Sequence, residues 1–553
     1  MKARTLFALS LLLALFASPF KSQASHVPPG WGAWADGTTV DDLCPPLPEP
    51  TGRVVSVSSV AGLVAAVNGA LAGDTISIAD GTYNLDGAYL RIDVPGVTLR
   101  SASGNREAVV LDGNYVTTEI IQIVASDVTV ADLTLREAYY HPIHVMSTSS
   151  ADTVGTLIYN VHIIDPGEQA IKINPYTGEN ALYFPDNGEI ACSHIELTDA
   201  GRPHIRNNCY TGGVDAHQAR DWVIRDNLIE GFWCPSGLSE HAIHMWVSCR
   251  DTLVERNVLR NNARGVGFGM WENLSNRRTY PDDPCPSAGG GYVDHYGGII
   301  RNNFVFANEG ALFSSDDGFD CGICLWQACG ARVLHNTVAS TQAPVSSSIE
   351  WRFDHTDVDI INNLVTHGLV DRGGSAYLGG NLTSVPLSLF VDGAGGDLHL
   401  VSTASAAIDQ VAAPIDAPDD VDGDLRPIGS ASDVGADEYG IPAPVAVTDL
   451  RATQAVAGTG ELTATLRWTA PSNAITTTLR YSNTLITEAN WDGALSLTDT
   501  LPGSAEVYTA VVPYSGGTIY FALRTQGAGG LSNLSNNAFW PHLDVYLPLV
   551  LKD

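Results

Sequence analysis

Short segments rich in Val and Ile recur along the middle of the chain, and this repetition constrains the fold more than any other feature. Eight such segments carry a polar marker residue at a corresponding place. Successive markers are 28, 33, 34, 30, 46, 33 and 27 residues apart, and they are Asp132, Asn160, Ser193, Asn227, Asn257, Asn303, Asn336 and Asn363. A recurrence of this length without helical periodicity predicts a solenoid of stacked β-strands.

The marker residues are interpreted as scaffold. An Asn amide both donates and accepts hydrogen bonds, so copies on successive coils can form a continuous ladder. The longest interval contains an insertion over residues 271–291 that is rich in Pro, Gly and Asp. We expect this insertion to loop out over one face of the solenoid.

An amphipathic stretch of Ala, Val and Leu precedes the coils, within residues 57–83. We expect a helix here that covers the open end of the stack, because an unpaired edge would promote aggregation. This segment and the coils resemble the right-handed parallel β-helix families of secreted polysaccharide lyases, which are pectate lyase-like, and the chondroitin and alginate lyases in particular. The resemblance covers about residues 54–439 and implies an all-β fold more than a chemistry.

Composition changes divide the chain into five segments. The N-terminus has the basic start, apolar run and small-residue end of a secretory signal peptide. Near the C-terminus, spaced strands with Trp468, Tyr481 and Tyr520 resemble a fibronectin type III β-sandwich. The predicted segments are a signal peptide (1–24), an N-terminal extension (25–53), the β-helix (54–440), the fibronectin type III-like domain (441–540) and a short tail (541–553).

Export and charge limit the partners of the chain. The apolar run from Leu6 to Ala17 is too short to span a bilayer, so we expect a secreted or cell-surface protein without membrane insertion. A net charge of −32 argues against nucleic-acid binding. The sequence leaves the oligomeric state open, and a monomer is the expectation.

The chain has nine cysteines, and an exported protein is expected to form disulfides. We predict the pairs Cys192–Cys209 and Cys234–Cys249, with Cys44 left over. The alternative for the later cysteines is a zinc site, since four thiolates complete a tetrahedral shell. Its ligands would be Cys285, Cys321, Cys324 and Cys329.

Strand alternation indicates which residues face solvent. In five successive coils an inward Val or Ile aligns with its copies, so the next residue points outward. The outward column is His144, Lys172, Asp215, His244 and Gly267. A neighbouring column, two residues further along, is Met146, Asn174, His217, Trp246 and Gly269. Coils stack about 4.8 Å apart, so several column members can reach one substrate.

Lys172 is the single lysine of the coils, since the others are at positions 2, 21 and 552. A lysine can be tuned to act as a base, which an arginine cannot do at ordinary pH. The surrounding segment, residues 201–278, carries ten Arg against eight Asp and Glu. This local basic balance suits an acidic polysaccharide, although many of these arginines are expected to pair with neighbouring acids.

The segment SEHAIHMW gathers Glu240, His241, His244 and Trp246, and the next coil supplies Arg264. Trp246 is expected to offer a flat apolar platform for a sugar ring, with Glu240 and His241 as further substrate-binding candidates. His241 and His244 are three residues apart, which on a regular strand places them on opposite faces. This spacing argues against a metal held by both rings.

A second acidic cluster, SSDDGFD, contains Asp316 and Asp317. Paired carboxylates serve as acid and base in glycoside hydrolysis, but the remaining signature of the β-helix polygalacturonases is missing. A Ca²⁺ site or a polar turn is the competing interpretation.

The leading hypothesis is a polysaccharide lyase that cleaves a uronic-acid polymer by β-elimination, as the resembled lyases do. Arg264, or Ca²⁺ held by acids such as Asp215, would meet the uronate carboxylate. The base would be Lys172 or His244, and the helper would be His144 or His217. Asn174 would bind substrate. A C5-epimerase, a glycoside hydrolase and a non-catalytic carbohydrate-binding or adhesive rod are the alternatives.

Overall fold

The structure is a computed structural model. It describes residues 44–540 except 178–180, 238, 413–414, 441–443, 472 and 528, and the side chains of 498–500 are also left out. The predicted signal peptide and C-terminal tail lie outside the described residues. Among the described residues, no helix is long and apolar enough to cross a membrane.

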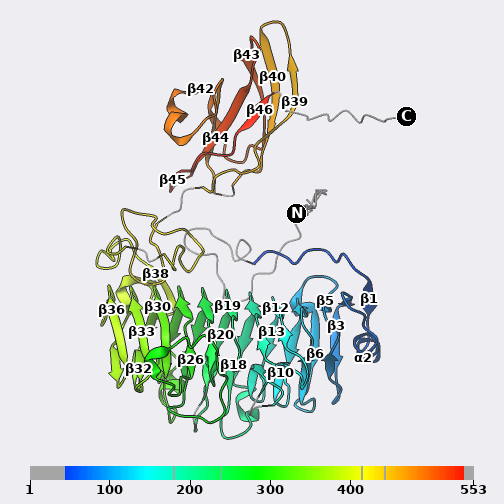
Figure 1. The fold of residues 1–553 in the computed structure, drawn as a ribbon, viewed down its shortest axis with the longest axis vertical. Helices are drawn as coiled ribbons and strands as arrows, with labels where there is room; N and C mark the ends of the chain where they lie inside the picture. The colour runs from blue at the N-terminus through cyan, green and yellow to red at the C-terminus, as the bar shows by residue number, and fades with distance from the viewer. Residues whose placement is uncertain are drawn as a thin grey trace, which may run out of the picture.

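Three long parallel sheets form a right-handed β-helix, and each coil contributes about one strand to each sheet (Figure 1). Sheet A has 14 strands: β1 (Val54–Val57), β2 (Thr75–Ile78), β5 (Thr98–Ser101), β8 (Thr129–Ala131), β12 (Leu157–Tyr159), β16 (Glu189–Ala191), β19 (Val223–Arg225), β22 (Cys249–Arg250), β23 (Leu253–Glu255), β26 (His295–Tyr296), β27 (Ile299–Arg301), β30 (Ala328–Leu334), β33 (Asp357–Ile361) and β36 (Ser375–Gly379).

Sheets B and C have 10 strands each. Sheet B consists of β3 (Gly81–Asn84), β6 (Val109–Asp112), β9 (Thr134–Arg136), β13 (His162–Ile164), β17 (His194–Glu196), β20 (Leu228–Glu230), β24 (Val258–Arg260), β28 (Phe304–Ala307), β31 (Thr337–Ser340) and β34 (Leu364–Val365). Sheet C consists of β4 (Leu90–Ile92), β7 (Glu119–Ile123), β10 (His141–Met146), β14 (Gln169–Asn174), β18 (Gly212–His217), β21 (His241–Trp246), β25 (Arg264–Phe268), β29 (Cys321–Trp326), β32 (Ser347–Arg352) and β35 (Leu369–Arg372).

One continuous apolar core runs through the coils from Val57 to Val365. The expected capping helix is α2 (Val60–Asn68), which lies beside β1 at the N-terminal end of the stack (Figure 1). Ser59 caps its start by accepting a hydrogen bond from the Gly62 amide, and Leu63 and Val67 are buried against the first coil. The helix therefore closes the open end, as the sequence predicted.

The Asn ladder exists, but it uses only part of the predicted set. The side-chain amides of Asn227, Asn257, Asn303 and Asn336 each donate to the next Asn at 2.9–3.0 Å, and Asn363 continues the ladder to Asn381. Ser193 begins it, because its backbone amide donates to the Asn227 side chain.

Asp132 and Asn160 stand one residue before the ladder position of their coils. The predicted set of markers therefore combined residues from two neighbouring columns. That earlier position has left-handed backbone in coil after coil, with φ of 57° at Asp132, 49° at Asn160 and 56° at Asp226. Asn and Asp tolerate this conformation at a corner, which is why both columns look alike in the sequence.

Segments at both ends run along the outside of the coils. The N-terminal one packs Cys44 and Leu47 against Tyr159. The C-terminal one, residues 387–440, covers sheet B, with Leu398 and Leu400 packed against Phe304. It contains β37 (Phe390–Asp392) paired with β38 (Asp397–Leu400), and the remaining short elements are β11 (Thr153–Val154), β15 (Pro185–Asp186), α3 (Gly310–Phe313) and 3-10 turns at Arg106–Ala108, Arg202–His204, Pro286–Ala288 and Leu387–Leu389.

The C-terminal region contains two antiparallel sheets around a shared core that includes Leu466, Trp468 and Phe521. They are β39 (Arg451–Ala457), β40 (Glu461–Arg467) and β43 (Val507–Pro513), and β41 (Thr476–Ser482), β42 (Leu495–Pro502), β44 (Ile519–Gly527), β45 (Gly530–Leu531) and β46 (Ala538–Trp540), with a 3-10 turn at Glu488–Gly493. This is a β-sandwich; its assignment to the fibronectin type III family stays a prediction.

Both predicted disulfides are wrong. The four disulfides are Cys44–Cys192, Cys209–Cys234, Cys285–Cys329 and Cys321–Cys324. Cys209 and Cys234 precede successive strands of sheet C, so stacking of coils brings them together although they are 25 residues apart. The free cysteine is Cys249, which is fully buried, and not Cys44 as predicted. All four cysteines of the alternative zinc site are engaged in disulfides.

Candidate functional site

The strand register brings together the predicted outward columns. On sheet C, each inward residue pairs with the next one in the series Ile143, Ile171, Val214 and Ile243. The residues that follow them along the chain pair in the same way. The first column is therefore His144, Lys172, Asp215, His244 and Gly267 in successive strands. In the second column Met146 pairs with Asn174, and His217 pairs with Trp246.

Lys172 is the centre of a polar cluster on the outer face of sheet C. Its Nζ forms an ion pair with Asp215 and lies 3.1 Å from Nε2 of His217 and 3.4 Å from the Tyr210 hydroxyl. Tyr210 also donates to Asp215, at 3.1 Å, and Nε1 of Trp246 donates to the other carboxylate oxygen at 2.5 Å. His217 Nε2 lies 3.6 Å from Asp215, so three groups that can carry a proton, Lys172, Tyr210 and His217, surround this carboxylate.

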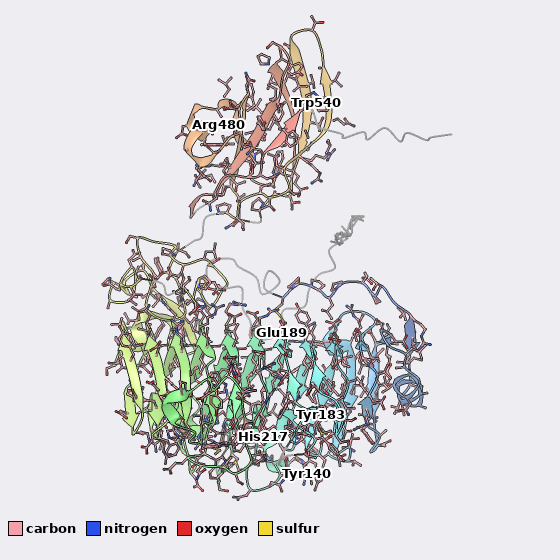
Figure 2. The ribbon with its side chains drawn as sticks, in the orientation of Figure 1. Tyr140, Tyr183, Glu189, His217, Arg480 and Trp540 are labelled. Atoms are coloured by element: carbon pink, nitrogen blue, oxygen red, sulfur yellow. A yellow bond between two sulfur atoms is a disulfide. The ribbon has the colours of Figure 1, made fainter. Side chains whose placement is uncertain are left out.

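Exposure differs sharply within the cluster. Asp215 is 1% exposed, the side chain of Lys172 10% and that of His217 24%. Figure 2 labels His217 at the lower edge of the coils. A ligand reaching this face would meet His217 and the tip of Lys172, while Asp215 stays beneath them.

The electrostatics of the cluster follow from burial and from the ion pair. Burial alone would raise the pKa of Asp215, but Lys172 and His217 lower it well below its usual range. Burial, followed by the charge of Lys172, lowers the pKa of His217 to about 3, so the ring is neutral at pH 7. Burial and Asp215 raise the pKa of the Tyr210 phenol far above its usual range, so it stays protonated. The cluster holds one cation, one neutral imidazole and one phenol.

His144 lies one coil before Lys172. Its Nδ1 contacts Glu119 at 2.8 Å and its Nε2 contacts Oδ1 of Asn174 at 2.7 Å. His144 and Asn174 are both partly exposed, so this pair extends the polar face beyond Lys172.

Trp246 does not form the exposed platform that the sequence predicted. It is 8% exposed, its ring stacks on His244 at 4.8 Å, and it meets His217 edge-on. His244 has no exposed surface, and its Nε2 lies 3.3 Å from the Gly269 carbonyl oxygen. Alternation identifies the face of a strand but not what a neighbouring large ring covers, which is why both residues lie beneath the surface.

His241 and His244 share one face, contrary to the prediction. Their ring centroids are 4.2 Å apart, and Glu240 contacts both rings. The cause is a local break in alternation, because Ala242 and Ile243 are adjacent and both lie in the apolar core. Two successive inward residues return their neighbours to the same outer face.

Arg264 and the acidic pair lie further along the solenoid. Nε of Arg264 pairs with Asp320 at 2.8 Å, and its guanidinium lies over Trp326. Asp316 is exposed, and one oxygen of Asp317 is buried without a hydrogen-bond partner. The other arginines of the basic segment are largely paired, as expected, for example Arg256 with Asp226 and Arg278 with Asp186.

The Ca²⁺ prediction fits poorly at Asp215, since both of its oxygens already accept hydrogen bonds. Four groups of potential metal ligands occur among the described residues, and none contains Asp215, Asp316 or Asp317. Ca²⁺ binding stays a prediction.

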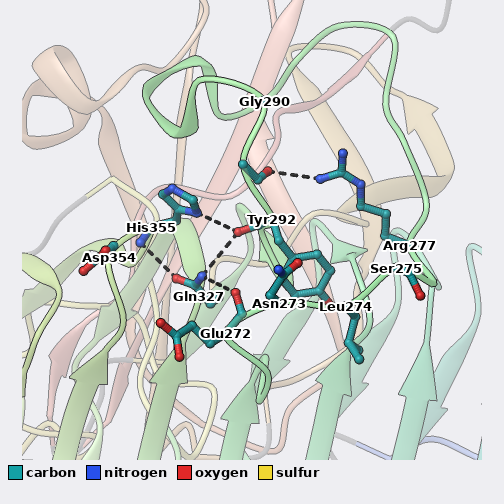
Figure 3. A pocket seen from close by; sticks show the side chains of 11 residues that line it. Glu272, Asn273, Leu274, Ser275, Arg277, Gly290, Tyr292, Gln327, Asp354 and His355 are labelled. Carbon is teal, nitrogen blue, oxygen red and sulfur yellow. Dashed lines mark hydrogen bonds between the residues drawn. The ribbon is translucent and has the colours of Figure 1, made fainter.

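The insertion after β25 forms the wall of a cavity of about 780 Å³ (Figure 3). The cavity is braced by polar contacts. Nε2 of Gln327 donates to the Glu272 carbonyl at 2.8 Å, and Nδ1 of His355 lies 2.8 Å from the Tyr292 carbonyl oxygen. The insertion is therefore packed against the coils as well as looped out.

Tyr210 and Glu119 belong to the polar face but were missed in the sequence. Tyr210 lies in the loop before β18, and strand alternation does not place loop side chains. Glu119 begins β7, one coil before the columns that were aligned. Extending the alignment back by one coil would have found Glu119.

No family model matches the chain, and no curated protein matches it. The chain does match solved structures. An alginate lyase from Paenibacillus sp. str. FPU-7 is 16% identical and covers 60% of this chain and 98% of its own, with a TM-score of 0.39. The pectate lyase Pel9A is 14% identical and covers 70% and 97%, with a TM-score of 0.46. A pectate lyase from Bacillus sp. N165, in complex with trigalacturonate, is 12% identical and covers 61% and 83%, with a TM-score of 0.28.

Proposed function

We propose that the chain is a secreted lyase that cleaves an acidic, uronic-acid-containing polysaccharide by β-elimination at the Lys172 cluster. The observation that supports this most is that a neutral histidine and a protonated tyrosine both lie within 3.4 Å of the lysine nitrogen. β-Elimination needs a cation, a base and an acid at one sugar ring.

Each group suits one role. Lys172 meets the uronate carboxylate and stabilises the negative charge that develops on it. His217, neutral and partly exposed, removes the C5 proton. The C4–O bond then breaks as the C4–C5 double bond forms, and Tyr210 gives its proton to the leaving oxygen. The C5 proton on His217 then passes to solvent and the Tyr210 phenolate takes up a proton from solvent, which restores both groups and closes the cycle.

The other predicted roles fit less well. His244 has no exposed surface, so it would have to move before acting as a base. Arg264 is paired with Asp320 and lies on β25, two strands from His217 on β18, so it is outside the Lys172 cluster. His144 and Asn174 remain suitable for binding a neighbouring sugar, because both lie at the surface beside Lys172.

The proposal is tested by ultraviolet absorbance of the unsaturated uronate. Purified mature protein is offered alginate, pectate, chondroitin, dermatan and glucuronan, each with and without Ca²⁺. Absorbance should rise on at least one polymer. Reducing sugar without absorbance would indicate a hydrolase, and deuterium exchange at C5 without cleavage an epimerase. Retention of a polymer without any chemistry would indicate a binding rod.

A further inference from the structure

Glu240, His241 and His244 form a closed cluster beneath the surface of β21. The two histidines have no exposed surface, and Glu240 is 6% exposed. One ligand atom from each residue lies within 4.8 Å of the other two. Oε2 of Glu240 is 3.0 Å from Nδ1 of His244 and 3.8 Å from Nδ1 of His241.

The facing atoms of this cluster are not satisfied by one another. Oε2 of Glu240, Nδ1 of His244 and both ring nitrogens of His241 are buried and make no hydrogen bond. Oε2 of Glu240 and Nδ1 of His244 are within hydrogen-bonding distance, but when Nε2 of His244 donates to the Gly269 carbonyl oxygen, both facing atoms carry lone pairs. Burying a polar atom without a partner is unfavourable, so four such atoms facing one another indicate a missing ligand.

The surroundings orient the rings. Nε2 of His244 lies 3.3 Å from the Gly269 carbonyl oxygen, which leaves Nδ1 as the lone-pair nitrogen that faces Glu240. A backbone acceptor on the far nitrogen is the usual partner of a metal-ligating histidine. Gly267 makes room for the second ring, because a Cβ there would lie 2.6 Å from His241.

We infer that Glu240, His241 and His244 bind a divalent transition metal of the zinc class. Two imidazoles and one carboxylate form a donor set suited to Zn²⁺ or Co²⁺, whereas Ca²⁺ requires oxygen ligands. The sulfurs of Cys321 and Cys324 also lie near His241, but they are bonded to each other and do not act as thiolates. This site is separate from the proposed elimination and does not depend on it.

The site is tested on the full-length mature protein with its disulfides intact. The protein is incubated with ZnCl₂ or CoCl₂ and dialysed, and bound metal is then measured by plasma mass spectrometry and Co²⁺ visible absorbance. The variants are His241→Gln and the nearly isosteric Glu240→Gln. The matched control is His295→Gln, because His295 is also fully buried but lies against Phe268 and Thr252.

Wild type and His295→Gln should retain about one equivalent of metal, and both cluster variants less than about a tenth of that. Circular dichroism checks that the variants are folded. Wild type with less than about a tenth of an equivalent and no Co²⁺ band would overturn the inference, whether or not the variants fold. Undiminished metal in folded Glu240→Gln and His241→Gln would do so as well. Since none of these readouts needs a polysaccharide, failure of the lyase proposal leaves the result interpretable.

Discussion

At the residue scale, the stability of the polar cluster depends on the buried ion pair of Lys172 and Asp215. Asp215 is 1% exposed and receives hydrogen bonds from Trp246 and Tyr210 in addition to the ion pair. A buried carboxylate of this kind depends on its cation, because its remaining partners are neutral.

Lys172→Met should therefore destabilise the protein by about 3–5 kcal/mol, since it leaves an uncompensated charge in the interior. Lys172→Met/Asp215→Asn should recover much of this loss, because the neutral amide keeps the shape of the carboxylate. The measurement is the free energy of unfolding in urea. Equal stability of the single and double variants would show that Asp215 is not held by Lys172.

The columns around this pair could be predicted from the sequence because inward Val and Ile fix the register of each strand. How deeply each side chain is buried could not be predicted from the sequence. His244 and Trp246 were placed on the correct face, yet they pack on one another below the surface. Tyr210 could not be found at all, because it reaches the cluster from a loop.

At the scale of elements, the coils are joined by the Asn ladder as well as by their sheets. Asn303 donates to Asn336 and to two backbone carbonyl oxygens, and it accepts from the backbone and side chain of Asn257. Repetition made this ladder predictable. The sequence did not show that Asp132 and Asn160 stand at the preceding corner, because Asn and Asp suit both positions.

Asn303→Ala should lower the stability of the coils by about 2–3 kcal/mol, because it leaves the Asn257 amide without its acceptor. Asn308→Ala is the matched control: this Asn is exposed, and its loss should cost less than about 0.5 kcal/mol. Thermal unfolding followed by circular dichroism measures both. Similar melting temperatures for the two variants would contradict a structural role of the ladder.

At the scale of the whole molecule, the segments at the two ends of the β-helix run back along its coils. Cys44 is joined to Cys192 across 148 residues. In the C-terminal segment Asp419 pairs with Arg256 at 2.8 Å, and Ala436 donates to Thr337 at 2.9 Å. We call these contacts of the C-terminal segment the C-terminal tie; the sequence did not predict its partners, because such contacts leave no periodic pattern.

The C-terminal tie should be sensitive to alkaline pH through His399. Burial lowers the pKa of His399, but hydrogen bonds to Asp397 and Asp422 raise it to about 11. The folded pKa lies above the unfolded value of about 6.5, so this stabilisation is complete below about pH 6.5 and is lost as the pH rises towards 11. Between these limits, wild type should lose up to about 1.4 kcal/mol per pH unit relative to His399→Gln. Parallel pH–stability curves for the two proteins would refute the tie.

The central claim is elimination at the Lys172 cluster, and the initial rate of unsaturated uronate formation tests it most directly. On a polymer that wild type cleaves, Lys172→Gln and His217→Asn should each lower the rate by at least about 100-fold. His295→Gln, remote from the cluster, should leave the rate unchanged. Folded Lys172→Gln and His217→Asn proteins that retain the wild-type rate would contradict the account.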